Sequence, residues 1–213
     1  MDRIVDNRSR PEDALRAAIE GGELLPGQRL VEADLSRQLG VGRAAVRTAL
    51  ARLEHEGLLS HEANRGARVR LVPLDEAVEI VEVRGALEGL VVRRAAERAD
   101  AEDVRRLRGV LDEMRRLLEL GDLLAASDRN ADLHRLLLEL GGHETANRLI
   151  GTLRSQLVRF EYRTILAPGR AQCSLAEHTA IVDAVADGDG ERAEAAMRAH
   201  LRNVARALAA VER

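Results

Sequence analysis

Four side chains in the C-terminal part of the sequence could together bind a metal ion. Asn130 and His134 are four residues apart, so in a helix they lie on one face. His178 and His200 belong to two later segments with helical periodicity. Neutral imidazole suits late first-row ions, and facing helices of a bundle are a common place to build such a site. From spacing alone, each histidine could also be an ordinary core or surface residue.

A second group of residues could contact DNA. Arg43, Arg47 and Thr48 cluster at the N-terminal end of a predicted helix, where a recognition helix meets base edges and phosphates. Arg65 and Gly66 stand at the tip of a predicted hairpin, where an arginine could enter a minor groove or pair with a phosphate. The alternative is that these arginines cover a solvated helix face, as many arginines do.

The local charge favours the DNA interpretation. The formal net charge of the chain is −3, but residues 37–70 hold seven arginines against three acidic residues. Acidic residues outnumber arginines after residue 73. A positive segment on an acidic chain is typical of a DNA-reading head attached to another domain.

Short elements before Pro73 must position the DNA-facing residues. Apolar periodicity and Gly or Pro breaks predict helices at 10–20, 32–39 and 43–56, then short strands at 58–61 and 67–71 around the turn at 64–66. Two helices joined by Gly40-Val41-Gly42 have helix-turn-helix spacing, and a hairpin after the second of them is a wing.

After Pro73 the 3.6-residue period dominates. It predicts six helices, at 75–98, 101–119, 122–140, 144–166, 171–187 and 190–211. Their short connections favour an antiparallel bundle. The expected fold is therefore mainly α, with a winged helix-turn-helix domain over residues 1–72 and a six-helix bundle over residues 73–213.

Composition excludes some classes of protein. No apolar run approaches the ~18 residues of a membrane-spanning helix, and the N-terminus lacks the apolar stretch of a secretory signal. Cys173 is the single cysteine and cannot form an intramolecular disulfide. These features indicate an unexported cytoplasmic protein with no membrane partner.

Residues 15–69 closely resemble the DNA-binding domain of the GntR family of transcription regulators. The resemblance rests on Leu-Val-Glu at 30–32, Leu-Gly-Val at 39–41, Glu-Gly-Leu at 56–58 and the Arg65-Gly66 wing. It implies DNA contacts by Arg43, Arg47 and Gly66. Gly42 and Ala44 stand where the family usually has Ser and Thr, so the DNA-facing position of Ala44 lacks a hydroxyl for phosphate. The complete set of expected DNA-binding residues is Arg43, Ala44, Arg47, Thr48, Arg65 and Gly66.

Residues 78–208 look like the FCD effector domain of the FadR subfamily, through VEVRGALEGLVVRRAA, NADLHRLLLELGG and SLAEHTAIVDAVADGDGERAEAAMRAHL. Six helices rather than seven resemble the VanR-like branch. In many members an Asp and three His hold a metal. The resemblance places a divalent ion of the Zn, Ni or Mn class at Asn130, His134, His178 and His200.

The first of these ligands departs from the family pattern. Asn130 offers a neutral carbonyl oxygen where the family has a carboxylate, so the ion should bind more weakly. Asp132 cannot replace it, because two residues along a helix turn through ~200°.

Arg84 has two interpretations. The resemblance implies that it contacts the carboxylate of a small effector, which a bidentate guanidinium would anchor beside the metal. Alternatively, it forms an ion pair with Glu88 at i+4.

These features predict a homodimeric repressor that binds a palindromic operator in double-stranded DNA and is controlled by a carboxylate metabolite. One alternative is a DNA-binding or architectural protein with no metal or effector. A more remote one is a metal-dependent enzyme, for which the sequence offers no positioned general base, nucleophile pair or phosphate-binding loop. The chain is therefore not expected to be an enzyme.

Overall fold

The computed structural model describes residues 10–62, 66–157, 160, 167 and 169–210. The chain forms two compact units. The N-terminal unit contains Met1–Val72 with Arg154–Val158, and the C-terminal unit contains Pro73–Leu153 with Arg159–Arg213. Each unit has its own hydrophobic core and is described separately.

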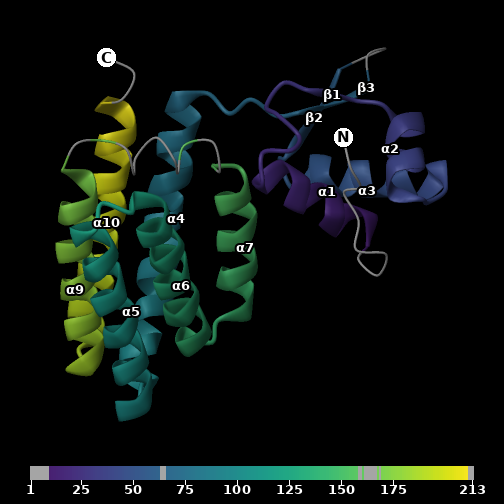
Figure 1. Cartoon of the computed structure of the whole chain (residues 1–213). Helices are drawn as coiled ribbons and strands as arrows, with labels where there is room; N and C mark the ends of the chain where they lie inside the picture. The colour runs from purple at the N-terminus through teal and green to yellow at the C-terminus, as the bar shows by residue number, and fades with distance from the viewer. Residues whose placement is uncertain (1–9, 63–65, 158–159, 161–166, 168, 211–213) are drawn as a thin grey trace. The chain divides into compact units, whose positions relative to one another are not determined.

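In its described residues, the N-terminal unit combines three helices with a small sheet (Figure 1). The helices are α1 (Pro11–Glu20), α2 (Glu32–Leu39) and α3 (Arg43–His55), and the strands are β1 (Arg29–Leu30), β2 (Leu59–Glu62) and β3 (Gly66–Val69). The strands are antiparallel in the order β1-β3-β2. This is a winged helix-turn-helix, as the sequence predicts.

The turn between α2 and α3 depends on two glycines. Gly40 ends α2 in the left-handed region, with φ 67°, where a residue without a Cβ is favoured. Gly42 is extended and precedes the first residue of α3. The chain therefore passes from α2 into α3 within three residues, and one face of α3 remains exposed to a partner.

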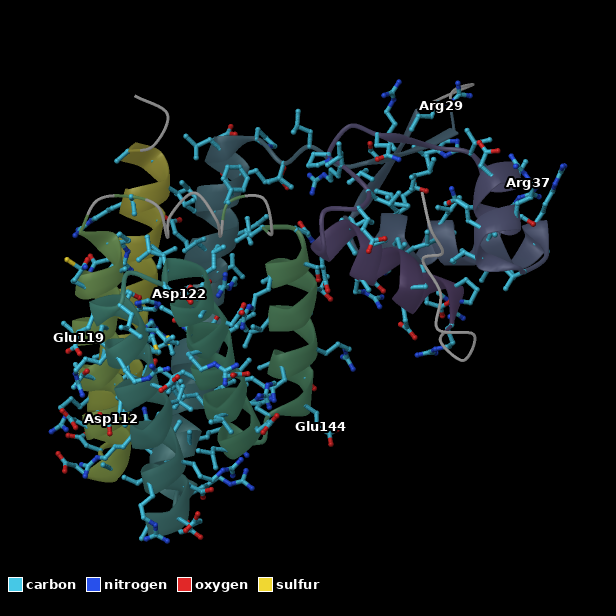
Figure 2. The ribbon with its side chains drawn as sticks, in the orientation of Figure 1. Arg29, Arg37, Asp112, Glu119, Asp122 and Glu144 are labelled. Carbon is cyan, nitrogen blue, oxygen red and sulfur yellow. The ribbon has the colours of Figure 1, made fainter. Side chains whose placement is uncertain are left out.

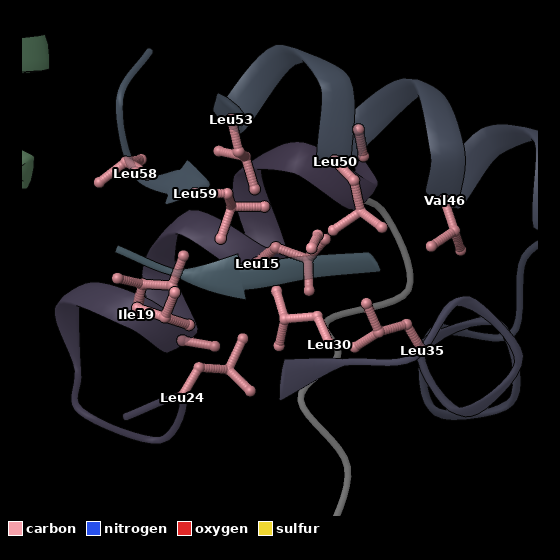
Figure 3. Packing of buried hydrophobic residues seen from close by; sticks show 14 of the residues in the cluster. Leu15, Ile19, Leu24, Leu30, Leu35, Val46, Leu50, Leu53, Leu58 and Leu59 are labelled. Carbon is pink, nitrogen blue, oxygen red and sulfur yellow. The ribbon is translucent and has the colours of Figure 1, made fainter. Parts of the chain in front are cut away.

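Leucine-rich packing holds these elements together (Figure 3). Leu15 of α1, Leu53 of α3 and Leu59 of β2 are among the fully buried side chains of one cluster. Leu30 of β1 and Leu35 of α2 belong to the same cluster. Aliphatic side chains thus fill a core that contains no aromatic residue among the described buried positions.

The sequence did not predict β1. It has only two residues, and it pairs with the wing, with Arg29 opposite Arg68 and Leu30 opposite Ala67. A two-residue strand carries no period of its own, so only its tertiary partner makes it visible.

The C-terminal unit is a bundle. Its described helices are α4 (Leu74–Arg98), α5 (Ala101–Glu119), α6 (Leu123–Gly141), α7 (Glu144–Ser155), α9 (Arg170–Ala186) and α10 (Gly190–Ala210). The long helix α4 packs against α10, α6 and α9, while α5 packs against α6 and α9 (Figure 1).

Helix α5 shows why these segments form a bundle. Leu107, Leu111 and Met114 are buried on one face. Charged residues such as Asp112 and Glu119 project from the other face (Figure 2). The amphipathic pattern therefore orients the helix toward its neighbours.

The helix expected at 144–166 is interrupted after Ser155, where α7 ends and Leu157 N donates to Arg154 O at 2.8 Å in a turn. Phe160 is helical again, and the rest of the expected segment, 158–159 and 161–166, lies outside the described residues. The apolar spacing continues, since Leu157 and Phe160 are both buried, but Gly, Thr and Ser at 151, 152 and 155 are weak helix formers.

Among the described residues, no helix is long and apolar enough to cross a membrane.

Candidate functional site

Three helices of the C-terminal unit bring His134, His178 and His200 together. They come from α6, α9 and α10, and one ring nitrogen of each lies within 4.8 Å of those of the other two. All three are buried, with exposed fractions of 4%, 0% and 4%. Since scattered polar residues rarely meet in a core without a purpose, this group, called here the histidine cluster, is the candidate metal centre.

Two of the ring nitrogens are at the spacing of two ligands of one metal. His134 Nε2 lies 3.1 Å from His178 Nε2, and the two rings are nearly perpendicular. Metal–nitrogen bonds of about 2.0–2.1 Å place neighbouring ligand nitrogens roughly 3.0–3.4 Å apart. In the absence of metal, the same distance suits a hydrogen bond from one imidazole to the other.

Carboxylates hold the opposite nitrogen of two of the rings. His134 Nδ1 lies 3.0 Å from Glu88 Oε2, and His200 Nδ1 lies 2.7 Å from Glu177 Oε2. A carboxylate accepts, so Nδ1 carries the proton in both rings and the lone pair of a neutral ring is on Nε2. This is the arrangement that orients and strengthens histidine ligands in metal sites.

The third ring, His178, has a hydroxyl partner. Its Nδ1 lies 3.3 Å from Ser174 Oγ, one helical turn earlier in α9. Burial lowers the pKa of His178 well below its usual value, and the charge of Arg170 acts in the same direction. Burial also lowers the pKa of His200, against the opposing effect of its bond to Glu177. Both rings are therefore neutral at pH 7, the form that binds metal.

Asn130 completes the expected set of four. Its Oδ1 is buried and has no hydrogen-bond partner among the described residues. It is one turn before His134 in α6, so both side chains leave the same face. A buried amide oxygen without a partner, one helical turn from a histidine of the cluster, fits a divalent cation, which would satisfy it.

Asp132 points elsewhere, as the helical geometry predicts. Its carboxylate pairs with Arg129 Nη1 at 2.9 Å and with Arg135 Nη2 at 2.8 Å on the outer face of α6. It cannot reach the histidine cluster while it keeps these partners.

Arg84 forms the ion pair that was one of its two interpretations. Its Nε and Nη2 lie 2.8 and 2.7 Å from Glu88 Oε1, and both side chains are buried. Because Glu88 also bonds His134, Arg84 is linked to the histidine cluster through one carboxylate. The effector contact remains a prediction.

The sequence analysis did not identify a second carboxylate, Glu177, that links an arginine to the histidine cluster. Glu177 Oε2 accepts from Arg170 Nη2 at 2.8 Å, and Glu177 Oε1 accepts from Asn203 Nδ2 at 2.9 Å. Burial would raise the pKa of Glu177, but hydrogen bonds from His200, Arg170 and Asn203 outweigh it and lower the pKa to about 2. Glu177 directly precedes His178 in the sequence, but this adjacency does not predict its role, because its partner His200 lies on another helix.

The predicted DNA-facing residues are gathered on one face of α3. Arg43, Ala44, Arg47 and Thr48 are exposed, while Val46 is buried in the core on the other side. Thr48 Oγ1 donates to Ala44 O at 3.1 Å, which leaves its lone pairs free to accept. The face therefore presents the basic side chains that a recognition helix needs.

Arg47 has a carboxylate partner. Its Nε and Nη2 lie 3.2 and 3.1 Å from the two carboxylate oxygens of Glu32 in α2. The hydrogen bond from Arg47 lowers the pKa of Glu32. At the wing, Gly66 has φ 80°, which favours glycine, whereas Arg65 lies outside the described residues.

These two sites define a class: a winged-helix DNA-binding protein with a helical sensor domain. Residues 8–69 match the family described as bacterial regulatory proteins, gntR family, and residues 79–203 match the FCD domain. The chain belongs to the GntR family of transcription regulators and carries an FCD domain. Its relatives are regulators and not enzymes.

Individual relatives agree with this assignment. The chain is 32% identical over 199 residues to a probable D-xylose utilization operon transcriptional repressor of Paenarthrobacter nicotinovorans, covering 91% of this chain and 84% of the relative. It is 32% identical over 212 residues to the HTH-type transcriptional regulator LutR of Bacillus subtilis, covering 87% of this chain and 94% of LutR. The structure of E. coli McbR/YncC shares the fold, with a TM-score of 0.76 at 22% identity over 96% of this chain and 98% of that one.

Proposed function

We propose that this regulator is a repressor whose operator affinity is controlled by a small carboxylate bound beside a divalent metal ion. The observation that carries the proposal is the buried histidine cluster, with its outward nitrogens held by Glu88 and Glu177. The finer assignment to the VanR-like branch of the FadR subfamily is part of the same proposal and rests on the six helices expected from the sequence.

The two parts of the chain have separate roles in this proposal. Residues 1–72 bind DNA through Arg43, Ala44, Arg47, Thr48, Arg65 and Gly66. Residues 73–213 bind the effector and form a homodimer. A twofold dimer presents two recognition helices to a palindromic operator, whose half-site spacing must match their separation. Since its target is the chromosome, the protein acts in the cytoplasm.

Asn130, His134, His178 and His200 would hold the metal, of the Zn, Ni or Mn class. A bound divalent ion supplies a positive centre that can coordinate a carboxylate oxygen. The chain supplies three neutral imidazoles and one amide oxygen, with no charged ligand, so the positive charge of the ion is not cancelled by its ligands.

An effector changes DNA binding only if it binds one arrangement of the two heads better than another. Coupling of this kind is typically about 1–3 kcal/mol, or roughly 5- to 150-fold in operator affinity. Arg84, adjacent to the cluster through Glu88, is the expected effector contact.

Elemental analysis with native mass spectrometry tests the sensor half of the proposal. Full-length protein purified without a chelator or a polyhistidine tag should carry one metal ion per chain. His178→Ala should lose it, whereas His55→Ala, on the exposed surface of α3, should keep it. Protein that stays metal-free after incubation with Zn²⁺, Ni²⁺ and Mn²⁺ would favour the alternative, a regulator without a metal-dependent sensor.

Operator binding tests the DNA half. Arg47→Ala should abolish binding to operator DNA and leave the oligomeric state unchanged. Arg115→Ala removes an exposed arginine from α5, outside the DNA-binding unit, and should bind as the parent does. Unchanged binding by Arg47→Ala would overturn the assignment of α3 as the recognition helix.

A further inference from the structure

Arg170, the first residue of α9, places an unused hydrogen-bond donor next to the histidine cluster. Its side chain is only 11% exposed. One terminal nitrogen, Nη2, donates to Glu177 Oε2 at 2.8 Å. The other, Nη1, is buried and has no partner among the residues that the structure describes.

A buried guanidinium nitrogen without an acceptor is unfavourable, because it has lost its water and gained nothing. The two nitrogens of a guanidinium fork are arranged to bind a carboxylate or a similar anion. The orphaned Nη1 therefore indicates an acceptor that arrives with a ligand.

The charge balance around the cluster indicates how negative that ligand is. Two buried or nearly buried arginines, Arg84 and Arg170, are matched by two carboxylates, Glu88 and Glu177. The three imidazoles and the Asn130 amide carry no charge in the form that binds metal. A divalent ion thus brings two uncompensated positive charges into a buried site, and two negative charges from the ligand would neutralise them.

The metal site and Arg170 are two separate positive positions. Arg170 contacts Glu177, and Glu177 contacts the Nδ1 edge of His200, which faces away from the ligand nitrogen. A single compact anion on the metal would leave Arg170 unsatisfied. A ligand with two anionic groups on a short carbon chain can bind at both positions.

We propose that Arg170 binds one carboxylate of a dicarboxylate effector whose other carboxylate binds at the metal. This rests on the function proposed above and adds to it a ligand class and a specificity-determining residue. A monocarboxylate would occupy the metal and leave the Nη1 donor of Arg170 unpaired.

Calorimetric titration of the full-length, zinc-loaded protein tests the proposal with matched acids. Malate and 2-hydroxybutyrate share a four-carbon skeleton and a 2-hydroxyl group, and differ in the second carboxylate. Malate should bind at least 10-fold more tightly. Arg170→Gln should remove that preference by weakening malate binding, with zinc content and 2-hydroxybutyrate binding unchanged. Arg170→Lys, which keeps the charge, should retain part of it.

Controls separate this inference from the function on which it rests. Arg192→Gln, an exposed arginine paired with Asp187 on the surface, should behave as the parent. Equal affinity for the two acids, phosphate binding as tightly as malate, or an Arg170→Gln variant that keeps the preference would overturn the dicarboxylate inference alone. Failure to bind zinc would overturn the proposed metal sensor itself, and with it this inference.

Discussion

His134 and His178 face each other across α6 and α9 with their Nε2 atoms 3.1 Å apart. Removing one of them leaves a metal with too few donors in a rigid site. We expect His178→Ala to weaken zinc binding by more than the roughly 10- to 100-fold that follows loss of an outer-sphere partner. Competition with a chromophoric chelator measures the change, and His55→Ala serves as the control. Equal zinc affinity in both variants would exclude the cluster as the metal site.

Asn130 supplies the second prediction. Asn130→Asp introduces a carboxylate where a neutral oxygen now lies, and a charged ligand attracts a divalent ion more strongly. We expect zinc affinity to rise about 10-fold or more. Asp132→Asn makes the reverse exchange, from carboxylate to amide, two residues further along α6. This position lies on the face that carries Arg129 and Arg135. The Asp132→Asn substitution should leave zinc affinity unaltered; an equal change in both variants would mean that Asn130 is not a ligand.

Glu88 links Arg84 to His134, and both of its oxygens are used. Glu88→Gln leaves a buried guanidinium without its counter-charge, which we expect to reduce stability by about 3 kcal/mol. Thermal unfolding measures this, and zinc titration of the folded variant should show weaker binding because His134 loses its orienting acceptor. Glu97→Gln breaks an exposed pair with Arg93 and should change stability by less than about 1 kcal/mol. A Glu88→Gln variant as stable as Glu97→Gln would contradict this role.

Glu32 holds Arg47 on the DNA-facing surface. Glu32→Gln removes a negative charge from a surface that approaches phosphates and releases Arg47 from a fixed orientation. We expect binding to scrambled DNA to strengthen and the ratio of operator to scrambled affinity to fall. Fluorescence anisotropy at two salt concentrations measures both. An unchanged ratio would show that Glu32 does not orient Arg47 for recognition.

Gly141 allows α6 to approach α4 closely. A Cβ at this position would lie 2.4 Å from Val91 O, which is a backbone atom and cannot move aside easily. Gly141→Ala should therefore lower stability by about 1–3 kcal/mol. Gly109→Ala is a matched control with the opposite sign, since a Cβ there meets no atom within 4 Å in α5 and should raise stability by about 0.5–1 kcal/mol. The two melting temperatures should move in opposite directions; the same direction in both would contradict the close packing.

Local sequence patterns were sufficient to predict most of the helices and strands. The Gly40-Val41-Gly42 turn, the apolar spacing of α2 and α3, and the period of the long helices are all set by residues within one or two turns of each other. Prediction failed at the two-residue strand β1, because a strand of that length has no period of its own and is decided by its packing partner. It also missed the interruption after Ser155, because the apolar spacing continues through Leu157 and Phe160.

The sequence by itself determined which residue types were present and which of them shared a helix face, including Asn130 with His134 and the separation of Asp132 from both. Only the tertiary structure decided that His134, His178 and His200 meet, and that Glu88, Glu177 and Arg170 surround them. The physical reason is that contacts along one helix follow from its 3.6-residue period, whereas contacts between helices depend on how whole faces pack, which no local spacing encodes.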